Sequence, residues 1–496
     1  MKDPVTEASS AETERFEALA NVALERARSA GASHADVRVV STETRELAVR
    51  KSQVSRCSRD ESLGVAVRVL VEGAWGFAAA PLSGDAELLG RLADRAVGEA
   101  RAGARHRAAK AVLAPLPAQR GRFVSPREED PFAMGLEEQF DLLFEVDREL
   151  VRAKDLATTS TQMSFARERQ WQFTSEGHLV EQDLLRSGAG FALTLARDGI
   201  VQTRSYPASF GGQYLQGGFE VVRGMRLRDH VARVQEEASE LLRAAPCPGG
   251  RFDMVVGGSQ LALQIHESVG HPNEFDRVLG FEADLAGQSF VTPEKRNRFV
   301  YGAPIVDLVA DSTLAGGIGT FGWDDDAVPG QRFHVVEQGV HRNWFTNREF
   351  ATRLGDGASN GTNRAEGWRY PPQIRIPNLS LMWGSSTRDE LIAGIDDGFL
   401  LDGVKTWSID ELRLNFQFTS EIAWRIRAGR VAEVVRNPTY QGVTPEFWSS
   451  CDGIAGREEW AAWGVPNCGK GQPMQVAEMS HGCAPARFRG VTFLQA

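Results

Sequence analysis

The chain has 496 residues, which is enough for two or three domains with cores of their own. Hydrophobic residues make up 42% and charged residues 25%, as in ordinary soluble globular proteins, and the net charge of −10 argues against a nucleic-acid-binding surface. No run approaches the ~18–20 apolar residues of a membrane span. We therefore expect neither a nucleic acid nor a membrane as a partner.

The cysteines and the N-terminus indicate the compartment. Five scattered cysteines and the absence of a signal-peptide pattern favour a reducing cytoplasm over a disulfide framework. Residues 1–14 are polar and acidic, and we expect them to form a short disordered tail.

Residues 15–245 are expected to form an N-terminal α/β domain of helices and a sheet. Helical spacing predicts a helix over 11–30 that ends at Gly31, and the sequence around Gly73 predicts a hairpin turn into a strand. Further helices are predicted at 85–101, 136–154 and 227–244, and strands at 35–40, 46–50, 62–70, 157–166, 171–175, 178–185 and 190–196.

Residues 246–496 are expected to form a second, β-rich domain, so the predicted fold class is α+β. The boundary is placed at Pro246-Cys247-Pro248-Gly249-Gly250, which breaks any regular element. After it come a strand at 252–256, many short strand candidates separated by glycines, among them 333–337, 374–382 and 412–424, and a helix at 387–395.

A candidate metal centre lies near the start of this second domain, in the sequence QIHESVGHP over residues 264–272. His266 and His271 are side chains that suit Zn²⁺, and Glu267 is placed to act as general base toward a water that the ion activates. The histidines stand five residues apart, whereas the usual zincin pattern has them four apart on one helical face.

That spacing requires an irregular helix. At ~100° per residue, a step of five places the second imidazole ~140° round an ideal helix. Both rings reach one ion only if the helix is distorted or ends between them. Gly270 and Pro272 supply the means, and we predict a helix over 259–269 that breaks at Gly270.

A catalytic zinc site usually has a third protein ligand, and Cys468 is the leading candidate. It lies in a glycine-rich stretch, where a thiolate can approach an ion closely, and Lys470 would favour the thiolate. The local alternative is a small buried cysteine in a turn. Cys483, with His481 two residues before it, is the rival ligand, and the roles of these two residues stay open.

Carboxylates near the histidines could orient the imidazoles. Glu274 and Asp276 are close enough in sequence to accept hydrogen bonds from them, although solvated loop carboxylates are the alternative. The run Asp324-Asp325-Asp326 could hold Ca²⁺, but a capped turn is the better interpretation.

With these residues in view, the sequence resembles the TldD/PmbA family of cytoplasmic metallopeptidases, also called the modulator of DNA gyrase family. The resemblance covers roughly residues 30–496. It rests on GVAVR at 64–68 with GAWGF at 73–77, on HESVGH at 266–271, and on CGKGQP at 468–473. The sequence departs from the commonest pattern over 480–489.

The resemblance implies a set of roles and a fold. His266, His271 and Cys468 would bind zinc and Glu267 would be the base. Because the chain keeps the zinc motif, it resembles the active TldD type rather than the partners that have lost it. The family fold joins an N-terminal α/β domain to a β-rich C-terminal domain, which would carry the metal site.

We therefore expect a zinc-dependent peptidase that hydrolyses unfolded or short peptides. It would act as a homodimer or as a heterodimer with an inactive paralogue. One alternative is a non-catalytic peptide-binding or scaffold subunit of a protease complex, which has no need to keep His266, Glu267 and His271 together. Another is a zinc amidohydrolase that acts on small molecules.

Overall fold

The computed structural model describes residues 4–83, 85–106 and 109–495. Strands take 42% of the residues and helices 25%, which confirms the predicted α+β class. The first half of the chain contains α1 (Pro4–Ser29), β1 (His34–Arg50), β2 (Gln53–Val71), β3 (Ala74–Pro81), α2 (Ala86–Ala104), β4 (Arg120–Val124), α3 (Leu136–Leu150), β5 (Leu156–Thr174), β6 (Leu179–Arg197), β7 (Ile200–Tyr206), β8 (Gln213–Gln216), α4 (Phe219–Gly224), a 3-10 turn (Leu227–His230) and α5 (Val231–Arg243).

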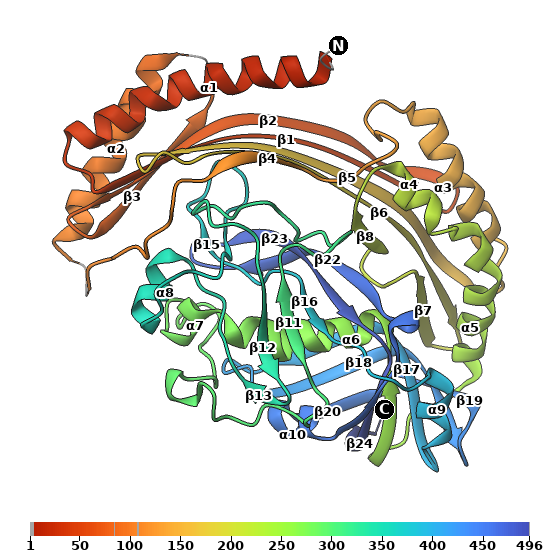
Figure 1. The fold of residues 1–496 in the computed structure, drawn as a ribbon. Coiled ribbons are helices and arrows are strands. Elements are labelled where there is room, and N and C mark those ends of the chain that lie inside the picture. Colours follow the sequence, from red (N-terminus) through yellow and green to blue (C-terminus); the bar gives the residue numbers. More distant parts are fainter. Residues whose placement is uncertain (1–3, 84, 107–108, 496) are drawn as a thin grey trace.

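The strands of this half form one long, curved sheet in the order β3-β2-β1-β5-β6-β4, with β7 and β8 also pairing with β6. Every pair is antiparallel except β4–β6. Figure 1 shows the sheet arching over the second half of the chain, with helices on its outer face at both ends. The first half is thus a layer of helices on a mainly antiparallel sheet rather than a parallel α/β unit.

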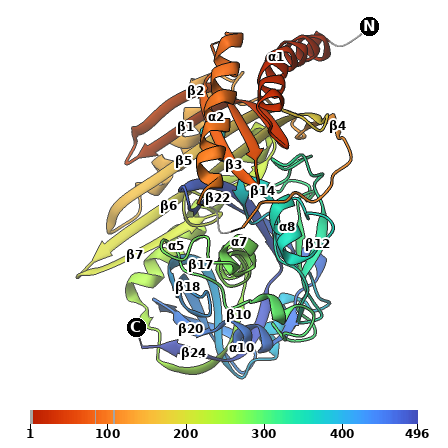
Figure 2. The same cartoon turned by 90° about the vertical axis from the view of Figure 1, so that its left-hand side faces the viewer.

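Side-chain alternation explains why the sheet has two different partners. Val37 and Val39 of β1 pack in the core beneath α1 and α2, and Leu47 packs in the core that includes α3 and α5. Asp36 and Arg38 point to the opposite face, toward the second half. Figure 2 shows the same layers from the side.

Two features of this half differ from the sequence-based expectation. Helix α1 begins at Pro4, so residues 4–14 are helical rather than a disordered tail; residues 1–3 lie outside the described part of the chain. Further along α1, Glu12 pairs with Arg169 of β5 at 3.1 Å and Thr13 accepts a hydrogen bond from Trp171 of the same strand.

The predicted short strands are parts of longer ones. The segments 35–40 and 46–50 are both in β1, 157–166 and 171–175 are both in β5, and 178–185 and 190–196 fall in the region of β6. Polar residues in the middle of these strands stay in the sheet because they find buried partners. Gln170 of β5, for example, lies between the two predicted segments and donates to a carboxylate oxygen of Asp325 at 2.7 Å.

The second half contains β9 (Ala245–Pro246), β10 (Gly250–Val256), α6 (Gly258–Ile265), α7 (Phe275–Val278), β11 (Leu308–Asp311), β12 (Arg332–Glu337), β13 (Val340–His341), α8 (Arg348–Leu354), β14 (Asn363–Arg364), β15 (Gln373–Ile374), β16 (Leu379–Leu381), α9 (Arg388–Ala393), β17 (Asp397–Ile409), β18 (Asn415–Arg427), β19 (Arg430–Arg436), β20 (Thr439–Val443), α10 (Thr444–Ser449), β21 (Cys451–Ile454), β22 (Ala461–Lys470), β23 (Gln475–Cys483) and β24 (Ala486–Leu494). The predicted strand 374–382 is interrupted at Pro377, which lacks the N–H that a ladder needs.

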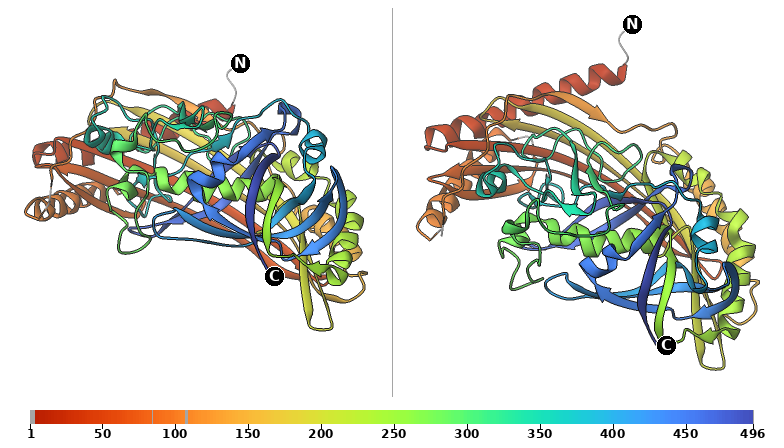
Figure 3. Two further views of the ribbon diagram at one scale, coloured as in Figure 1. Left: turned by 90° about the horizontal axis from the view of Figure 1, so that it is seen from below. Right: turned by 60° about the horizontal axis from the view of Figure 1, so that its bottom comes forward.

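Helix α6 lies against a ring of strands. The sheet runs β17-β10-β24-β20-β18, and β17 also pairs with β18, which closes the ring. Two further layers contact α6: a smaller sheet, β13-β12-β11-β16, through its strand β16, and the hairpin β22-β23. Figure 1 shows α6 between the ring of strands and the hairpin β22-β23, which lies beneath the long sheet, and Figure 3 shows the same arrangement from two other directions.

The buried apolar clusters change at the proline-glycine break. The clusters of the first half end at Leu242, and the cluster of the second half begins at Cys247. We propose this break, at 246–250, as the domain limit for that reason.

Buried charges join the halves. Arg68 of β2 binds Asp326 at 2.7 Å, and Arg38 of β1 binds Asp325 at 3.1 Å. Asp324 accepts hydrogen bonds from the backbone N–H groups of Asp326, Val328 and Asn363. The acidic run is thus a capped turn that binds arginines of the other half.

Candidate metal centre

The two histidines stand at a distortion of the helix. Helix α6 ends at Ile265, four residues earlier than predicted, and continues as a π turn over His266–Gly270. In this turn the N–H of His271 bonds to the carbonyl of His266, five residues back. A π turn holds more residues than the 3.6 of an α-helix, so a five-residue step brings both imidazoles to one side. Their ring centroids are 4.7 Å apart.

The predicted break at Gly270 is therefore replaced by a widening of the helix. Gly270 has ordinary helical backbone angles, with φ −61°. What it supplies is space, because a Cβ there would lie 2.7 Å from Cδ1 of Ile376. The short 3-10 turn at His271–Asn273, which contains Pro272, then ends the helical segment.

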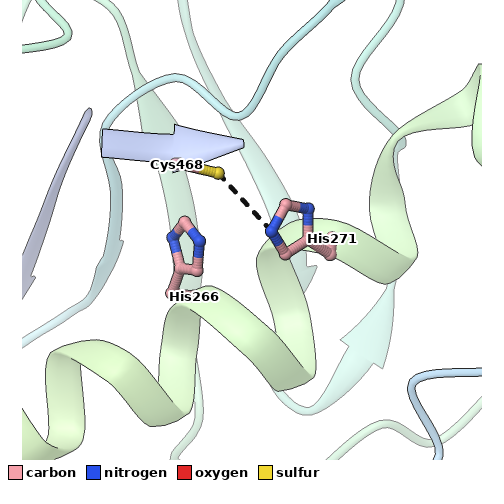
Figure 4. Close-up of side chains that lie close together, drawn as sticks. All are labelled: His266, His271 and Cys468. Carbon is pink, nitrogen blue, oxygen red and sulfur yellow. Dashed lines mark hydrogen bonds between the residues drawn. The ribbon is translucent and has the colours of Figure 1, made fainter. Parts of the chain in front are cut away.

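Cys468, on β22, completes a group of three potential ligands. The ligand atoms of His266, His271 and Cys468 all lie within 4.8 Å of one another, and all three residues are buried. Figure 4 shows the thiol of Cys468 facing the two imidazoles, with its sulfur 3.5 Å from Nε2 of His271. Only the fold brings it there, since about 200 residues separate it from the histidines.

Hydrogen bonds select the same tautomer for both histidines. Nδ1 of His271 is 2.9 Å from a carboxylate oxygen of Glu274, so it carries the proton. Nδ1 of His481 donates to the Leu379 carbonyl at 2.9 Å, which leaves Nε2 of His481 to accept from Nδ1 of His266 at 2.8 Å. Each of the two histidines therefore keeps the lone pair of its Nε2 for a metal ion.

These donors fit a divalent ion such as Zn²⁺. Two neutral imidazoles and one thiolate form a known type of catalytic zinc site with a fourth position left for water or substrate. Burial lowers the pKa of His266, which keeps the ring neutral. Burial raises the pKa of the Cys468 thiol, but the contact with His271 and the nearby Arg375 outweigh burial, so that pKa lies below its ordinary value.

Lys470 does not have the role that its position in the sequence suggested. Its ammonium group binds both carboxylate oxygens of Asp276, at 2.7 and 2.8 Å, and the Ile374 carbonyl at 2.6 Å. The cation that helps to lower the Cys468 pKa is instead Arg375, which donates to the Cys468 carbonyl oxygen. Lys470 thus anchors the end of β22 instead of activating the thiol of Cys468.

The two carboxylates proposed as imidazole partners take different places. Glu274 contacts His271 as described above, and its pKa is depressed because Lys470, His271 and Arg277 outweigh burial. Asp276 contacts Lys470 instead of an imidazole. Glu282, also buried, lies 3.6 Å from the same ammonium. These contacts with Lys470 join the end of β22, which carries Cys468, to the segment that follows the histidines.

Glu267 is held by two residues that sequence reasoning missed. Its Oε1 accepts a hydrogen bond from the indole N–H of Trp407 at 3.1 Å, and its Oε2 pairs with Arg413 at 3.3 Å. Burial raises the pKa of this carboxyl, but the neighbouring imidazoles, Arg413 and the hydrogen bond from Trp407 outweigh burial, so that pKa lies below its ordinary value. The sequence offered only a weak signal for these two residues, namely that Trp407 stands among polar residues near the end of a strand.

Cys483 lies apart from this group. Its sulfur contacts the Gly258 carbonyl at 3.5 Å, and burial raises the pKa of its thiol. Among the described residues, the group whose ligand atoms converge contains Cys468 and not Cys483.

A cavity of about 290 Å³ opens beside the three potential ligands. Both halves of the chain line it: Ser209 and Phe210 come from the loop between β7 and β8, and Trp407 comes from β17. The first half also holds β22 in place, because the Gln213 amide bonds the Ala462 carbonyl at 2.6 Å and the Gly464 N–H at 2.9 Å.

Comparison with known proteins agrees with this geometry. Residues 249–493 match the PmbA/TldA metallopeptidase C-terminal domain, and residues 35–100 match domain 1 of the same metallopeptidases. The chain belongs to the PmbA/TldD family.

Relatives of this PmbA/TldD protein carry protease names. Metalloprotease MJ0996 of Methanocaldococcus jannaschii is 25% identical over 446 residues, which cover 90% of this chain and 94% of the relative. A protein of Saccharolobus solfataricus named zinc metalloprotease TldD homolog is 24% identical over 217 residues, which cover 43% of this chain and 46% of the relative. These names support a metallopeptidase role.

Solved structures share the fold. A Thermotoga maritima protein described as a modulator of DNA gyrase superposes with a TM-score of 0.76 at 15% identity, over 97% of this chain and 100% of that one. TldE from Thermococcus kodakarensis superposes with a TM-score of 0.72 at 15% identity, over 97% and 99%. Within the described residues, no helix combines the length and apolarity needed to cross a bilayer.

Proposed function

We propose that this PmbA/TldD protein is a zinc-dependent peptidase of the active TldD type, which hydrolyses unfolded or short peptides. The observation that carries the proposal is the convergence of His266, His271 and Cys468 on one point, with Glu267 on the adjoining cavity wall. The set of donors suits zinc, and the relatives' names supply the reaction class.

Zn²⁺ held by the three side chains would act as a Lewis acid on the scissile carbonyl and lower the pKa of a water. Glu267, ionised and oriented by Trp407 and Arg413, takes a proton from the attacking water and gives it to the leaving amine. His481 and Glu274 hold the imidazoles in the tautomer that presents Nε2.

The substrate would be an extended chain rather than a folded domain, because the cavity of about 290 Å³ is at the low end for ligand sites. We further propose a dimer, either of this chain or with an inactive paralogue, in view of the fold shared with TldE.

Metal content and a base variant test the function. Freshly purified active protein should contain one zinc per active chain by elemental analysis. Glu267→Gln should keep the zinc, because Glu267 is not in the ligand group, yet lose roughly 10²–10⁴-fold in turnover of an unstructured peptide.

Three results would contradict the proposal. Active protein without zinc would exclude the metal mechanism, and near-normal turnover by zinc-loaded Glu267→Gln would remove Glu267 from it. Turnover of small amides without turnover of peptides would favour an amidohydrolase instead.

A further inference from the structure

The wall of the cavity beside Glu267 is aromatic. The indole of Trp407, which bonds Glu267, meets the ring of Phe210 edge to face, with centroids 5.3 Å apart and planes at 78°. Phe210 remains 54% exposed and Trp407 43% exposed. Large apolar rings that border a catalytic cavity without being covered are available to a ligand.

Packing does not account for the position of Phe210. Its backbone has φ +60°, in the left-handed region that side chains other than glycine rarely adopt. Such strain persists only where the surroundings impose it, and it often marks a functional position. Here it projects a half-exposed phenyl ring over the cavity instead of into a core.

The loop that carries Phe210 is held firmly. Ser209 accepts a hydrogen bond from the Val404 N–H at 3.0 Å and donates to Glu421 at 3.2 Å. Gly212 follows with φ +116°, and a Cβ there would lie 2.0 Å from the Ala189 carbonyl oxygen. The ring is therefore presented at a fixed place relative to Trp407 on the other half of the chain.

The structure assigns Phe210 and Trp407 to a side-chain subsite, which selects peptides with an aromatic or large aliphatic residue next to the cleaved bond. This inference rests on the proposed peptidase function and adds the substrate class. An aromatic ring of the substrate would complete a cluster with the two rings already there, and Leu263 and Val404 line the same cavity.

Paired peptides test the subsite. The two peptides are identical except for one residue beside the cleaved bond, which is Phe in one and Ala in the other, and a second pair varies the opposite side of the bond. The wild type should favour a Phe peptide by about 10-fold or more in kcat/KM. Phe210→Ala should remove most of that preference by slowing the Phe peptide, with little effect on the Ala peptide.

Two control variants separate the subsite from general damage. Phe210→Tyr keeps an aromatic ring and should keep the preference. Trp383→Ala removes another partly exposed ring, which pairs with Trp460 away from this cavity, and should change neither peptide. Fluorescence anisotropy of labelled peptides bound to Glu267→Gln should give the same ranking without turnover.

The outcomes distinguish the subsite from the function. Measurable hydrolysis of both peptides with equal kcat/KM would overturn the subsite and leave the peptidase proposal standing. Selective binding of the Phe peptide without hydrolysis by zinc-loaded wild type would overturn the function and support the subsite. Equal loss on both peptides in Phe210→Ala would show a structural role for the ring and overturn the subsite.

Discussion

At the scale of single residues, His266 and His271 are prepared for a metal by different kinds of partner. A carboxylate holds His271, whereas a second imidazole, itself bonded to a backbone carbonyl, holds His266. Mutation of residues that hydrogen-bond metal ligands in this way typically lowers metal affinity by about 10–100-fold. Cys468 and Cys483 are both buried, yet among the described residues it is Cys468 whose sulfur converges with the histidines.

The paired cysteine variants should therefore behave differently. Loss of a residue that hydrogen-bonds a metal ligand typically weakens metal binding by roughly 10–100-fold. Cys468→Ala removes a proposed ligand itself, so it should weaken zinc binding by at least as much and abolish peptide hydrolysis. Cys483→Ala should leave both largely intact, because its thiol bonds the Gly258 carbonyl and lies outside the ligand group. Competition with a metal chelator measures affinity, and spectroscopy of the metal-substituted protein would place a thiolate ligand. The reverse pattern would move the site to Cys483.

At the scale of elements, the π turn after α6 is the feature that makes a five-residue spacing usable. It turns two histidines that an α-helix would separate toward the same point. The turn packs closely, with Gly270 against the buried side chain of Ile376.

Gly270→Ala should disturb that packing. The added methyl would meet Cδ1 of Ile376, and overpacking of this kind costs about 1–3 kcal/mol in the free energy of unfolding. Zinc affinity should fall as well, because the turn that sets the histidines must shift. Denaturant unfolding and chelator competition measure the two effects.

A double mutant is the matched control for this clash. Ile376→Val removes Cδ1 of Ile376, the methyl group that the side chain added at position 270 would meet. The double mutant Gly270→Ala/Ile376→Val should therefore recover part of the stability and zinc affinity that Gly270→Ala loses. The effects of the two single substitutions should then not be additive. Strict additivity would show that Gly270 acts through its backbone freedom rather than through space.

At the scale of the whole molecule, buried ion pairs join the two halves that line the cavity. Arg68 of β2 lies between Asp36 of its own half, at 2.7 Å, and Asp326 of the other half, also at 2.7 Å. Arg204 of β7 likewise reaches Glu421 and Asp402. Because Phe210 and Gln213 lie in the first half, the relative position of the halves determines the shape of the site.

Arg68→Met should destabilise the protein most at neutral pH. It leaves two buried carboxylates without their guanidinium partner, which typically costs about 3–5 kcal/mol. In the wild type, Arg68 outweighs burial and holds the pKa of Asp36 and Asp326 below the ordinary value. Their stabilisation is therefore complete above the unfolded pKa of about 3.9 and is lost as the pH falls through the lower folded values.

Denaturant unfolding at pH 7 and below about pH 4 measures this dependence. The gap between wild type and Arg68→Met should narrow in acid, whereas Arg91→Met, which breaks only exposed pairs, should have little effect at either pH. An equal gap at both pH values would mean that packing, rather than charge, accounts for the loss.

The proposed dimer can be tested by its mass in solution. Light scattering of the active protein, alone or purified with its paralogue, should give a mass about twice that of the 496-residue chain or the sum of the two partners. An active monomer at working concentration would contradict the proposed dimer.

The sequence by itself determined the nature of the candidate site and most of the secondary structure. His266, Glu267 and His271 stand within six residues, and their spacing alone requires a distorted helix. Apolar periodicity located α2, α3 and α5, because a helix or strand with one buried face records that burial in its own residues. The family motifs added Cys468 and the fold.

Only the tertiary structure decided how distant residues meet. Nothing near His481, Trp407 or Arg413 predicts that they bond His266 and Glu267, because each lies 140 or more residues away. The same holds for the length of β5 and β6, whose polar middles look like loops until Gln170 and Arg186 find their partners in the other half. Local patterns report which face of a segment is buried, whereas the identity of its neighbours depends on strand order and register across the whole chain.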